Sequence, residues 1–574
     1  MVGVWFLYLL VPLTYVVITG LTTKKWKIGI YSLILPALLA GINTYFLLPS
    51  KNLLSIVGGN LFYLLIFILI YLFFAFVLTT DNSDDEYTEE YKSKKRTLFW
   101  LIAGNVLLLI VWGTGAIHSG MSVKPTYQSI NKEYSKSTRA PTFKRGETPI
   151  ALAPVTVLNR VRKSASDIPH SQYYSVSKNV QAQYYKGKPV YVVPVEYNGF
   201  FEMRNAKEIP GYFIIDATKQ SATPKFVKVP YKYATSAYFG KDASRQIYRK
   251  TSDWLTLGDP QLEINDVGKP YWVQTIYKSE AFSHRINFKK LHVAVLNAQN
   301  GDVKVYSLKS MPKFIDEGIT DATASKINKV FGKYKHGFWN AHFGKSDVIK
   351  PTGNGVENGV TSVFNKDGSI SYFTDFTTDK TGSDSAMGYS MINARTGKLT
   401  YYKASNLMDS DGAKHNANQD YKAQQWKANM PILYNVNGSP TWVMTILDST
   451  NAIRGYYYLN ASDQSIYAQG STPTSALDAY RQALVNNGGS VGNTSNAVMK
   501  NITGQVDRVA IISNQNKAMF TLQGSNIIYS VNTNDYIQAN LLQKGDKVSF
   551  KASMVKGQPI GNVKKFKDEN LTGR

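Results

Sequence analysis

Two histidines, His336 and His342 in the segment HGFWNAHFG, form the closest pair of imidazoles in the chain. Two histidines bind zinc on one helical face when they follow the HExxH spacing, in which a glutamate lies between them. The spacing here is longer, and no glutamate separates the two residues. The aromatic neighbours favour a packed loop, so we assign no metal ligand.

Two further segments have the composition of ligand-binding loops. GNGVENG at 353–359 lacks the Lys-Ser/Thr ending of a phosphate-binding loop, which predicts an ordinary turn. DSDGAKHNANQD at 409–420 has acidic residues at short intervals but lacks the glutamate that closes a calcium loop. We predict a surface loop at 409–420, with weak calcium binding as the alternative.

Serine, aspartate and histidine residues are scattered without a spacing that would define a catalytic triad. The chain has no cysteine, which excludes disulfides, thiolate zinc sites and cysteine nucleophiles. Carboxylates for glycan hydrolysis exist at Asp375, Asp379, Glu196 and Glu202, but nothing in the sequence pairs them. We therefore assign no catalytic, cofactor-binding or metal residues, and we expect a protein that is not an enzyme.

The chain is long and strongly basic. Its 574 residues exceed the size at which one hydrophobic core keeps growing, so several folding units are expected. A formal net charge of +25 attracts polyanions, namely nucleic acid, anionic lipid head groups or the phosphate-rich polymers of a Gram-positive wall. The same charge excess also favours solubility alone, so charge does not select one partner.

Four apolar stretches at the N-terminus are each long enough to cross about 30 Å of hydrocarbon as a helix. None of them contains Asp, Glu, Lys or Arg, which fits burial in lipid. Their polar residues Asn43, Asn60 and Asn105 are expected to form hydrogen bonds between helices. The stretches run approximately from 3 to 21, 28 to 48, 53 to 79 and 98 to 117, and we assign them to a membrane region of residues 1–119.

Basic residues of short loops stay preferentially on the cytoplasmic side of a membrane. The first and third loops are basic, whereas the loop between the second and third spans has only Lys51. This pattern predicts a multi-pass cell-membrane protein whose N-terminus and large C-terminal part are extracellular. The basic residues of the first and third loops are Lys24, Lys25, Lys27, Lys92, Lys94, Lys95 and Arg96.

Residues 120–149 are rich in Ser, Thr, Pro, Lys and Arg and have little apolar periodicity. This composition predicts an exposed basic stalk between the membrane and the outer domains. Such a stalk is expected to lie along anionic head groups or wall polymers.

Beyond the stalk, a short segment occurs twice, as PYWVQTI at 270–276 and as PTWVMTI at 440–446. Weaker copies are YVVPVEY at 191–197 and ISYFTDF at 370–376. Each copy precedes a second strand that ends in a polar turn, which predicts an antiparallel sheet in each unit. The turns are expected at Asp216, Asn297, Asn393 and Asn460.

Helices accompany these strands at 322–334 and 475–485, where apolar residues follow helical spacing behind a Thr or Ser cap. We therefore predict α+β modules, a first pair in 150–320 and a second pair in 321–487. The repeated tryptophans Trp272 and Trp442 are expected to anchor the cores of their sheets, with a carbohydrate platform as the alternative.

The turn of the third unit reads INARTGKLTYY at 392–402. This strand, turn and strand pattern resembles the PepSY-type domains of bacterial envelope proteins and peptidase propeptides, over about residues 170–485. The resemblance implies helix-plus-hairpin modules that bind or regulate envelope proteins or peptidases.

The C-terminal residues 502–574 contain five short strand-like segments and a Lys544-Gly545-Asp546 turn. They are similar to a small β-barrel of the OB type, preceded by a flexible linker at 488–501. OB barrels bind oligonucleotides or sugars on aromatic and basic faces. Strand alternation, however, places most of the aromatic residues in the core, which favours a structural barrel over a binding one. These aromatic residues are Phe520, Tyr529, Tyr536, Phe550 and Phe566.

The sequence thus predicts a multi-domain membrane protein with four transmembrane helices, extracellular α+β modules and a small C-terminal barrel. The leading hypothesis is a bacterial, Gram-positive surface protein that presents tandem modules to an envelope protein or an anionic wall polymer. The alternatives are a membrane-anchored regulator or inhibitor of an extracellular peptidase, a wall-acting enzyme and a nucleic-acid binder.

Overall fold

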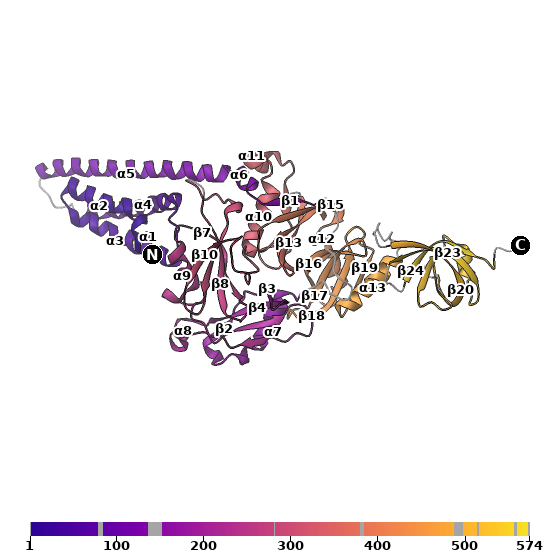
Figure 1. The fold of residues 1–574 in the computed structure, drawn as a ribbon. Helices are drawn as coiled ribbons and strands as arrows, with labels where there is room; N and C mark the ends of the chain where they lie inside the picture. Colours follow the sequence, from indigo (N-terminus) through magenta and orange to yellow (C-terminus); the bar gives the residue numbers. More distant parts are fainter. Residues whose placement is uncertain are drawn as a thin grey trace.

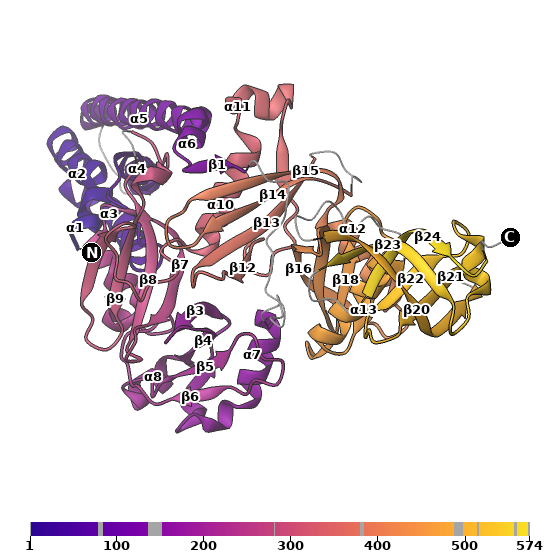
Figure 2. The ribbon, with the colours of Figure 1, turned by 45° about the vertical axis from the view of Figure 1, so that its right-hand side comes forward.

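A computed structural model describes residues 2–77, 84–135, 152–279, 282–378, 384–486, 497–513, 516–555 and 560–571. The chain passes from a bundle of helices at one end, through four sheets, to a barrel at the other end (Figure 1). A view turned by 45° again shows the helix bundle and the barrel on opposite sides of the molecule (Figure 2).

Three N-terminal helices are long and apolar enough to span a membrane. They are α3 (Trp26–Phe46), α4 (Leu53–Val77) and the part Lys95–Met121 of α5 (Asp84–Met121). A fourth candidate is the pair α1 (Val2–Tyr8) and α2 (Leu10–Thr23), whose axes differ by 57°. The described residues thus contain three such helices, or four if the bent pair makes one span.

The span predicted at 3–21 is interrupted at Leu9, and Asn60 of α4 occupies the break. The Asn60 side-chain oxygen accepts a hydrogen bond from Val11 N–H, and its amide nitrogen donates to the Leu7 carbonyl, both at 2.8 Å. These are the backbone groups that an unbroken helix would join to each other. One asparagine therefore satisfies both groups at the bend.

Asn43 donates to the hydroxyl of Tyr63 on α4 at 2.7 Å. Contacts of Asn43 and Asn60 between helices were predicted from the sequence, and both are confirmed. The amide nitrogen of Asn105 is buried and has no hydrogen-bond partner among the described residues. The prediction for Asn105 is therefore not met.

Four sheets follow, and we call them modules 1 to 4 in chain order. Modules 1, 2 and 4 are purely antiparallel, and module 3 gains one parallel strand at its edge. Module 1 contains β2 (Tyr174–Val176), β3 (Gln181–Tyr185), β4 (Lys188–Tyr197), β5 (Tyr212–Asp216) and β6 (Lys225–Val227). Module 2 contains β7 (Leu255–Ile264), β8 (Pro270–Tyr277), β9 (His292–Asn297) and β10 (Val303–Ser307).

Module 3 contains β11 (Ile349–Pro351), β12 (Thr361–Phe364), β13 (Ile370–Thr378), β14 (Ser385–Asn393) and β15 (Leu399–Met408), with β1 (Lys132–Tyr134) beside β15. Module 4 contains β16 (Lys427–Val436), β17 (Ser439–Leu447), β18 (Ile453–Asn460) and β19 (Tyr467–Gly470). The helices among the modules are α7 (Pro154–Lys163), α8 (Phe200–Ala206), α9 (Ala243–Thr251), α10 (Asp321–Lys333), α11 (Gly337–Trp339), α12 (Ser410–Asp420) and α13 (Pro473–Asn486). The predicted helices at 322–334 and 475–485 correspond to α10 and α13.

All four predicted turns form at the expected residues. In each, the side-chain oxygen of the Asp or Asn accepts a hydrogen bond from the backbone N–H two residues later, at 2.8 to 3.2 Å. This Asx turn reverses the chain without strain. An alanine directly follows each of these Asp or Asn residues, and it is buried. Its N–H donates to a carbonyl near the start of the strand that precedes and pairs with the turn-bearing strand. The turn residues are Asp216, Asn297, Asn393 and Asn460.

Each module has a buried aromatic residue on the strand that precedes the turn-bearing strand. It directly follows the residue that pairs with the Asp or Asn of the turn. Trp272 and Trp442 are both fully buried, and their indole N–H groups donate to the carbonyls of Tyr233 and Met408. Tyr191 and Tyr372 take the same place in modules 1 and 3 and are only 1 % exposed. The prediction that the tryptophans are core anchors is confirmed, and the four modules share one design.

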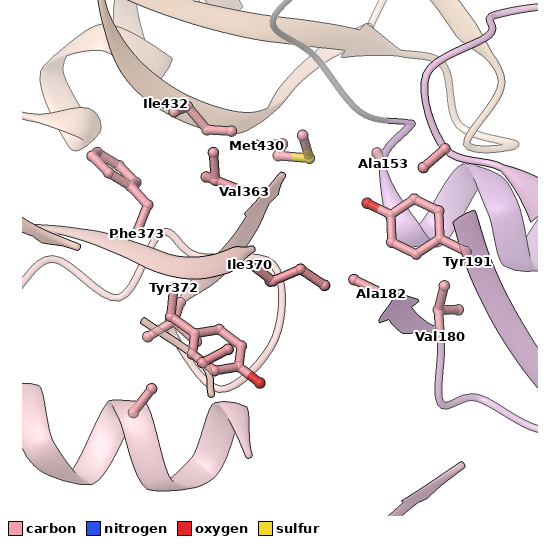
Figure 3. Close-up of a cluster of buried hydrophobic side chains, with 14 of the residues drawn as sticks. Ala153, Val180, Ala182, Tyr191, Val363, Ile370, Tyr372, Phe373, Met430 and Ile432 are labelled. Carbon is pink, nitrogen blue, oxygen red and sulfur yellow. The ribbon is translucent and has the colours of Figure 1, made fainter. Parts of the chain in front are cut away.

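The modules also share one core. Figure 3 shows Tyr191 of module 1, Tyr372 of module 3 and Met430 of module 4 within one cluster of buried side chains. This cluster is continuous from Tyr127 to Leu484. The predicted division at 320/321 therefore does not coincide with a break in the core, because α10 contacts strands of modules 2 and 3 alike.

The predicted exposed stalk at 120–149 is wrong over residues 120–135. The chain there forms the helix α6 (Val123–Gln128) and the strand β1, and Ile130 is only 3 % exposed. The physical reason is that β1 completes the edge of the module 3 sheet, so its backbone groups are paired. Residues 136–149 lie outside the described part of the chain.

The last region contains β20 (Ala497–Ile512), β21 (Lys517–Leu522), β22 (Ile528–Asn532), β23 (Lys547–Val555) and β24 (Ile560–Asp568). These strands pair in the closed order β20-β21-β22-β24-β23 around a core of their own. β20 begins at Ala497, so residues 497–501 of the predicted linker are strand, and its remainder, 488–496, lies outside the described residues.

Candidate functional site

A groove of about 700 Å³ crosses the outer face of the barrel, along β20, β23 and β24. Three lysines line it, Lys551, Lys565 and Lys567, and all three are exposed. The aromatic residues Tyr536 and Phe566 lie in its wall. The groove therefore combines positive charge with ring surfaces.

Hydrophobic packing inside the barrel positions this wall. Phe520 lies with its ring centroid 5.4 Å from that of Phe550 and 5.9 Å from that of Phe566. Phe520, Tyr529, Phe550 and Phe566 are each less than 8 % exposed, so most of the aromatic residues lie in the core, as predicted. Tyr536 is the only one of the five that is half-buried, and it lines the groove together with the buried Phe550 and Phe566.

A β-bulge orients the lysines of β24. The register between β23 and β24 shifts so that Lys551 pairs with Lys564 while Phe550 pairs with Phe566, which leaves Lys565 as the extra residue. Lys565 adopts a left-handed backbone with φ +57°, and its N–H donates to the Tyr536 hydroxyl at 2.8 Å. A bulge redirects side chains locally, and here it directs Lys565 and Lys567 toward the groove.

The charge of the barrel matches an anionic ligand. Residues 497–574 contain eleven Lys and Arg residues against five Asp and Glu residues, a formal charge of +6. Within the described residues, none of the three groove lysines takes part in an ion pair, whereas Lys544 and Lys547 outside the groove pair with Asp507 and Glu569. Ammonium groups donate hydrogen bonds to phosphate or carboxylate oxygens.

A second cavity, about 400 Å³, lies where modules 1, 2 and 3 meet. Its wall includes Asp259, Asp321 and Glu357. Burial first, and then the neighbouring Asp321, raises the pKa of Glu357 to about 8. At neutral pH this side chain is therefore largely protonated and uncharged.

Two more carboxyls, Glu263 and Glu317, are buried behind this cleft. Glu263 accepts hydrogen bonds from the backbone N–H groups of Asp316 and Glu317, at 2.8 and 3.2 Å. The side-chain amide of Gln181 in module 1 donates to Glu317. Burial and then the proximity of the other carboxyl raise the pKa of Glu317 well above its ordinary value. These groups join modules 1 and 2 through hydrogen bonds, and we interpret the cleft as a structural joint.

The two histidines do not come together as ligands. His336 pairs with Asp347 at 3.0 Å, and the ring of His342 packs 4.3 Å from that of Phe338. Within the described residues, no group of three or more His, Asp or Glu side chains is arranged to hold a metal ion. The segment 353–359 forms a turn, as predicted, with Glu357 bridging to Val360.

The surface loop predicted at 409–420 is wrong, because these residues form the helix α12. Asp409 caps the helix by accepting a hydrogen bond from Gly412 N–H at 3.0 Å. Ala413 and Ala417 are buried against the sheet of module 4. The acidic spacing that resembled a calcium loop is thus a helix cap followed by small packing residues.

The structure describes three of the four carboxylates considered for hydrolysis, and each has its own surroundings. Asp375 is buried and accepts hydrogen bonds from Thr352 and Ser410, while Glu196 is buried in module 1 and accepts from Thr235 and Ser236. Glu202 lies on α8, and Asp379 lies outside the described residues. The structure does not pair the three that it describes.

Sequence reasoning missed the groove lysines. The segment KKFK at 564–567 surrounds a core phenylalanine with basic residues, which is a signal that the sequence contains. The bulge that selects Lys565 and Lys567 has no such signal, because it depends on the register against β23. Neither a protein-family model nor a curated protein matches the chain.

Proposed function

We propose that the chain is a bacterial cell-surface membrane protein that binds an anionic polymer of the envelope through the lysine groove of its C-terminal barrel. The N-terminal helices anchor it, and modules 1 to 4 act as a spacer that holds the barrel away from the bilayer. The observation that carries the proposal is the groove formed by Lys551, Lys565 and Lys567 beside Tyr536.

Contacts of the loop between α3 and α4 support the predicted orientation. This loop contains Lys51 as its only basic residue, and the Lys51 N–H donates to the Ser252 carbonyl at 2.7 Å. Asn52 donates to the Ser283 carbonyl at 3.1 Å. A loop poor in basic residues favours the outer side of a bacterial membrane, and modules in contact with it belong on the same side.

The distance between the anchor and the groove supports the spacer. The barrel and the helix bundle lie at opposite ends of the molecule (Figure 1). An extended anionic polymer in the wall lies beyond the lipid head groups, so a binding face at the far end reaches it without bending of the modules.

Binding of a synthetic poly(glycerol phosphate) chain to the full-length protein in lipid nanodiscs tests this proposal. We expect the triple substitution Lys551→Gln, Lys565→Gln and Lys567→Gln to weaken binding at least about tenfold and to reduce the salt dependence by about one unit of log-log slope per lysine. Uncharged dextran is the control ligand. It is not expected to bind.

A matched variant removes the same charge elsewhere on the barrel, by Arg508→Gln, Lys544→Gln and Lys547→Gln. These three side chains are exposed and do not line the groove. We expect this variant to retain most of the affinity. Equal losses in both triple variants would mean that net charge alone attracts the polymer, and the groove would not be the site.

Regulation of an extracellular peptidase is the second candidate. The fourfold repetition of a helix-supported antiparallel sheet supports it, because this is the architecture that the resemblance to PepSY-type domains implies. Crosslinking in intact cells, followed by identification of the crosslinked proteins, tests it. A peptidase among proteins linked to modules 1 to 4 supports this candidate, and its absence argues against it.

A further inference from the structure

Aromatic side chains gather on the part of module 1 nearest the helix bundle. They lie on α8 and on the short 3₁₀ helix η3 (Phe239–Lys241), and we call Phe200, Phe201, Tyr238 and Phe239 the aromatic patch. Phe201 is 69 % exposed and Phe239 is 59 % exposed. The Phe200 ring lies between them, with centroids at 5.4 and 5.9 Å. Large exposed aromatic clusters on a folded surface mark an interaction site.

The patch is continuous with the end of the candidate membrane helix α3. The Phe239 N–H donates to the Tyr45 hydroxyl at 3.2 Å, and the two ring centroids are 6.0 Å apart. Next to Tyr45, Phe46 is 67 % exposed and Leu47 is 72 % exposed. One apolar surface therefore runs from the last turn of α3 onto module 1.

Polar contacts from α9, which packs on the strands of module 2, fix this part of the chain at the end of α3. The guanidinium group of Arg245 lies 3.9 Å from the Tyr45 ring centroid, and its Nε donates to the Tyr45 carbonyl at 3.0 Å. The Tyr248 hydroxyl donates to the Pro49 carbonyl. α8 and α9 consequently lie at the edge of the modules nearest the bundle (Figure 1). The patch therefore lies at the level of the end of α3.

Basic side chains surround the patch. Lys241 Nζ donates to the Lys207 carbonyl at 3.0 Å, which brings two ammonium-bearing residues together beside Phe239. Anionic head groups attract such residues near a bilayer surface. The basic residues are Arg204, Lys207, Lys241 and Arg249, and the carboxylates on or next to α8 are Glu202 and Glu208.

The backbone at Phe239 is unusual for an aromatic residue. Its φ is +53°, in the left-handed region that bulky side chains rarely occupy. The hydrogen bond to Tyr45 is made from the same residue. Strained conformations of this kind persist where the surroundings hold them, often at binding surfaces.

We propose that the aromatic patch inserts into the head-group region of the outer leaflet, as a second membrane contact beside the helix bundle. Aromatic rings favour the interface between hydrocarbon and water, and the adjacent lysines and arginines contact lipid phosphates. The partner is the anionic phospholipid surface around the end of α3. This inference rests on the proposed membrane anchoring.

The absence of cysteine allows single labels to be placed without other changes. Asn205→Cys on α8 places a fluorophore beside the patch while the four aromatic residues stay. Val267→Cys is the matched control, because Val267 is 73 % exposed at the β7–β8 turn, at the end of the sheet opposite to the residues that contact Asn52. Leu107→Cys on α5 reports on the bundle itself. Each variant is reconstituted as the full chain in vesicles of phosphatidylglycerol and phosphatidylcholine.

Quenching is then measured with two kinds of lipid, which carry a nitroxide either near the head group or near the end of the acyl chain. We expect strong quenching at position 205 by the head-group nitroxide, strong quenching at position 107 in the middle of the span by the acyl-chain nitroxide, and none at 267 by either. The substitutions Phe201→Ser and Phe239→Asn should reduce quenching at 205 several-fold, because they remove the rings, and asparagine tolerates a positive φ. Quenching at 107 should not change.

Three results would each contradict a different part of the proposal. Quenching at 107 with none at 205 would refute the lipid contact of the patch and leave the membrane anchor intact. A lack of quenching at 107 would refute the anchor itself. Quenching at 205 that persists without the two phenylalanines would show that proximity to the bundle, rather than the patch, brings α8 to the lipid.

Discussion

Modules 1 to 4 and the C-terminal barrel are both built mainly from antiparallel strands, but they differ in how their cores are organised. The four modules share one large cluster of buried side chains with members from Tyr127 to Leu484, and one face of module 2 adds a small cluster around Val273 and Ile315. The barrel buries Val506 to Phe566 in a separate cluster. A shared core joins the four repeats into one folding unit. A closed barrel has no unpaired strand edges, so it needs no neighbouring sheet.

This difference explains where the lysine groove is found. The modules use their polar residues to join one module to the next, as Gln181 does with Glu317. The barrel has satisfied its strand edges by closure, so its outer face is free to carry Lys551, Lys565 and Lys567. We propose that the repeated modules provide support and the closed barrel provides recognition, and four predictions test this contrast.

Removal of a module anchor should have the largest effect. Trp442→Ala deletes a fully buried indole and the hydrogen bond to Met408, a loss of about 3–5 kcal/mol in the free energy of unfolding. Because modules 1 to 4 share a core, amide hydrogen exchange should accelerate in all of them and stay unchanged in the barrel. The control Trp339→Ala changes a side chain that is 63 % exposed and should have little effect. Faster exchange in the barrel as well would contradict separate cores.

A rise in pH should weaken the modules more than the barrel. The pKa of Glu357 is raised from 4.5 to about 8, so the folded modules bind more protons than the unfolded chain over this interval. The contribution of Glu357 to stability is therefore greatest at the acidic end of this pH interval, and it is lost as the pH rises to about 8. Between pH 6 and 9 we expect the unfolding midpoint of the modules to fall by a few degrees, of order 2–4 °C per kcal/mol.

The substitution Glu357→Gln should flatten this pH dependence, because the amide does not titrate. Glu133→Gln is the control, since Glu133 is exposed and pairs with Lys398. Differential scanning calorimetry at several pH values measures both variants. An unchanged slope in Glu357→Gln would mean that Glu357 does not carry the effect.

Loss of one turn asparagine should have a smaller effect on the free energy of unfolding. Asn393→Ala removes acceptor bonds from Arg395 N–H and Thr396 N–H, at 3.2 and 2.9 Å, and should lower module stability by about 1–2 kcal/mol. In the barrel, Asn532→Ala removes one such bond, from Asn534 N–H, and should cost less. Denaturant unfolding of the two variants gives the comparison. Equal losses would show that the Asx turn of a module contributes no more to stability than the turn in the barrel.

Neutralisation of the groove should have the smallest effect on stability. The triple change at Lys551, Lys565 and Lys567 alters only exposed side chains, which usually shift the free energy of unfolding by less than about 0.5 kcal/mol each. The unfolding midpoint of the barrel should therefore stay nearly constant while polymer binding falls. A strong loss of barrel stability would mean that these lysines serve the fold rather than a ligand.

Much of the fold was predictable because its signals are local. Hydrocarbon-length apolar runs predicted α3, α4 and the end of α5, and the four turn residues predicted the chain reversals. The helix at 409–420 was missed because its cap, Asp409, and its small residues also fit a loop. The stalk prediction was wrong over 120–135 because the strand β1 was missed, which has three residues and pairs with β15, far away in the sequence.

The sequence by itself determined the membrane-length helices, the fourfold repeat and the aromatic anchors, because side-chain burial and turn chemistry depend on neighbouring residues. Tertiary structure alone decided that the four modules share a core, that a bulge at Lys565 directs lysines toward the groove, and that Phe239 contacts Tyr45 in the last turn of α3. These features depend on register and on contacts between residues far apart in the chain. No local pattern specifies such contacts, because many pairings bury the same side chains equally well.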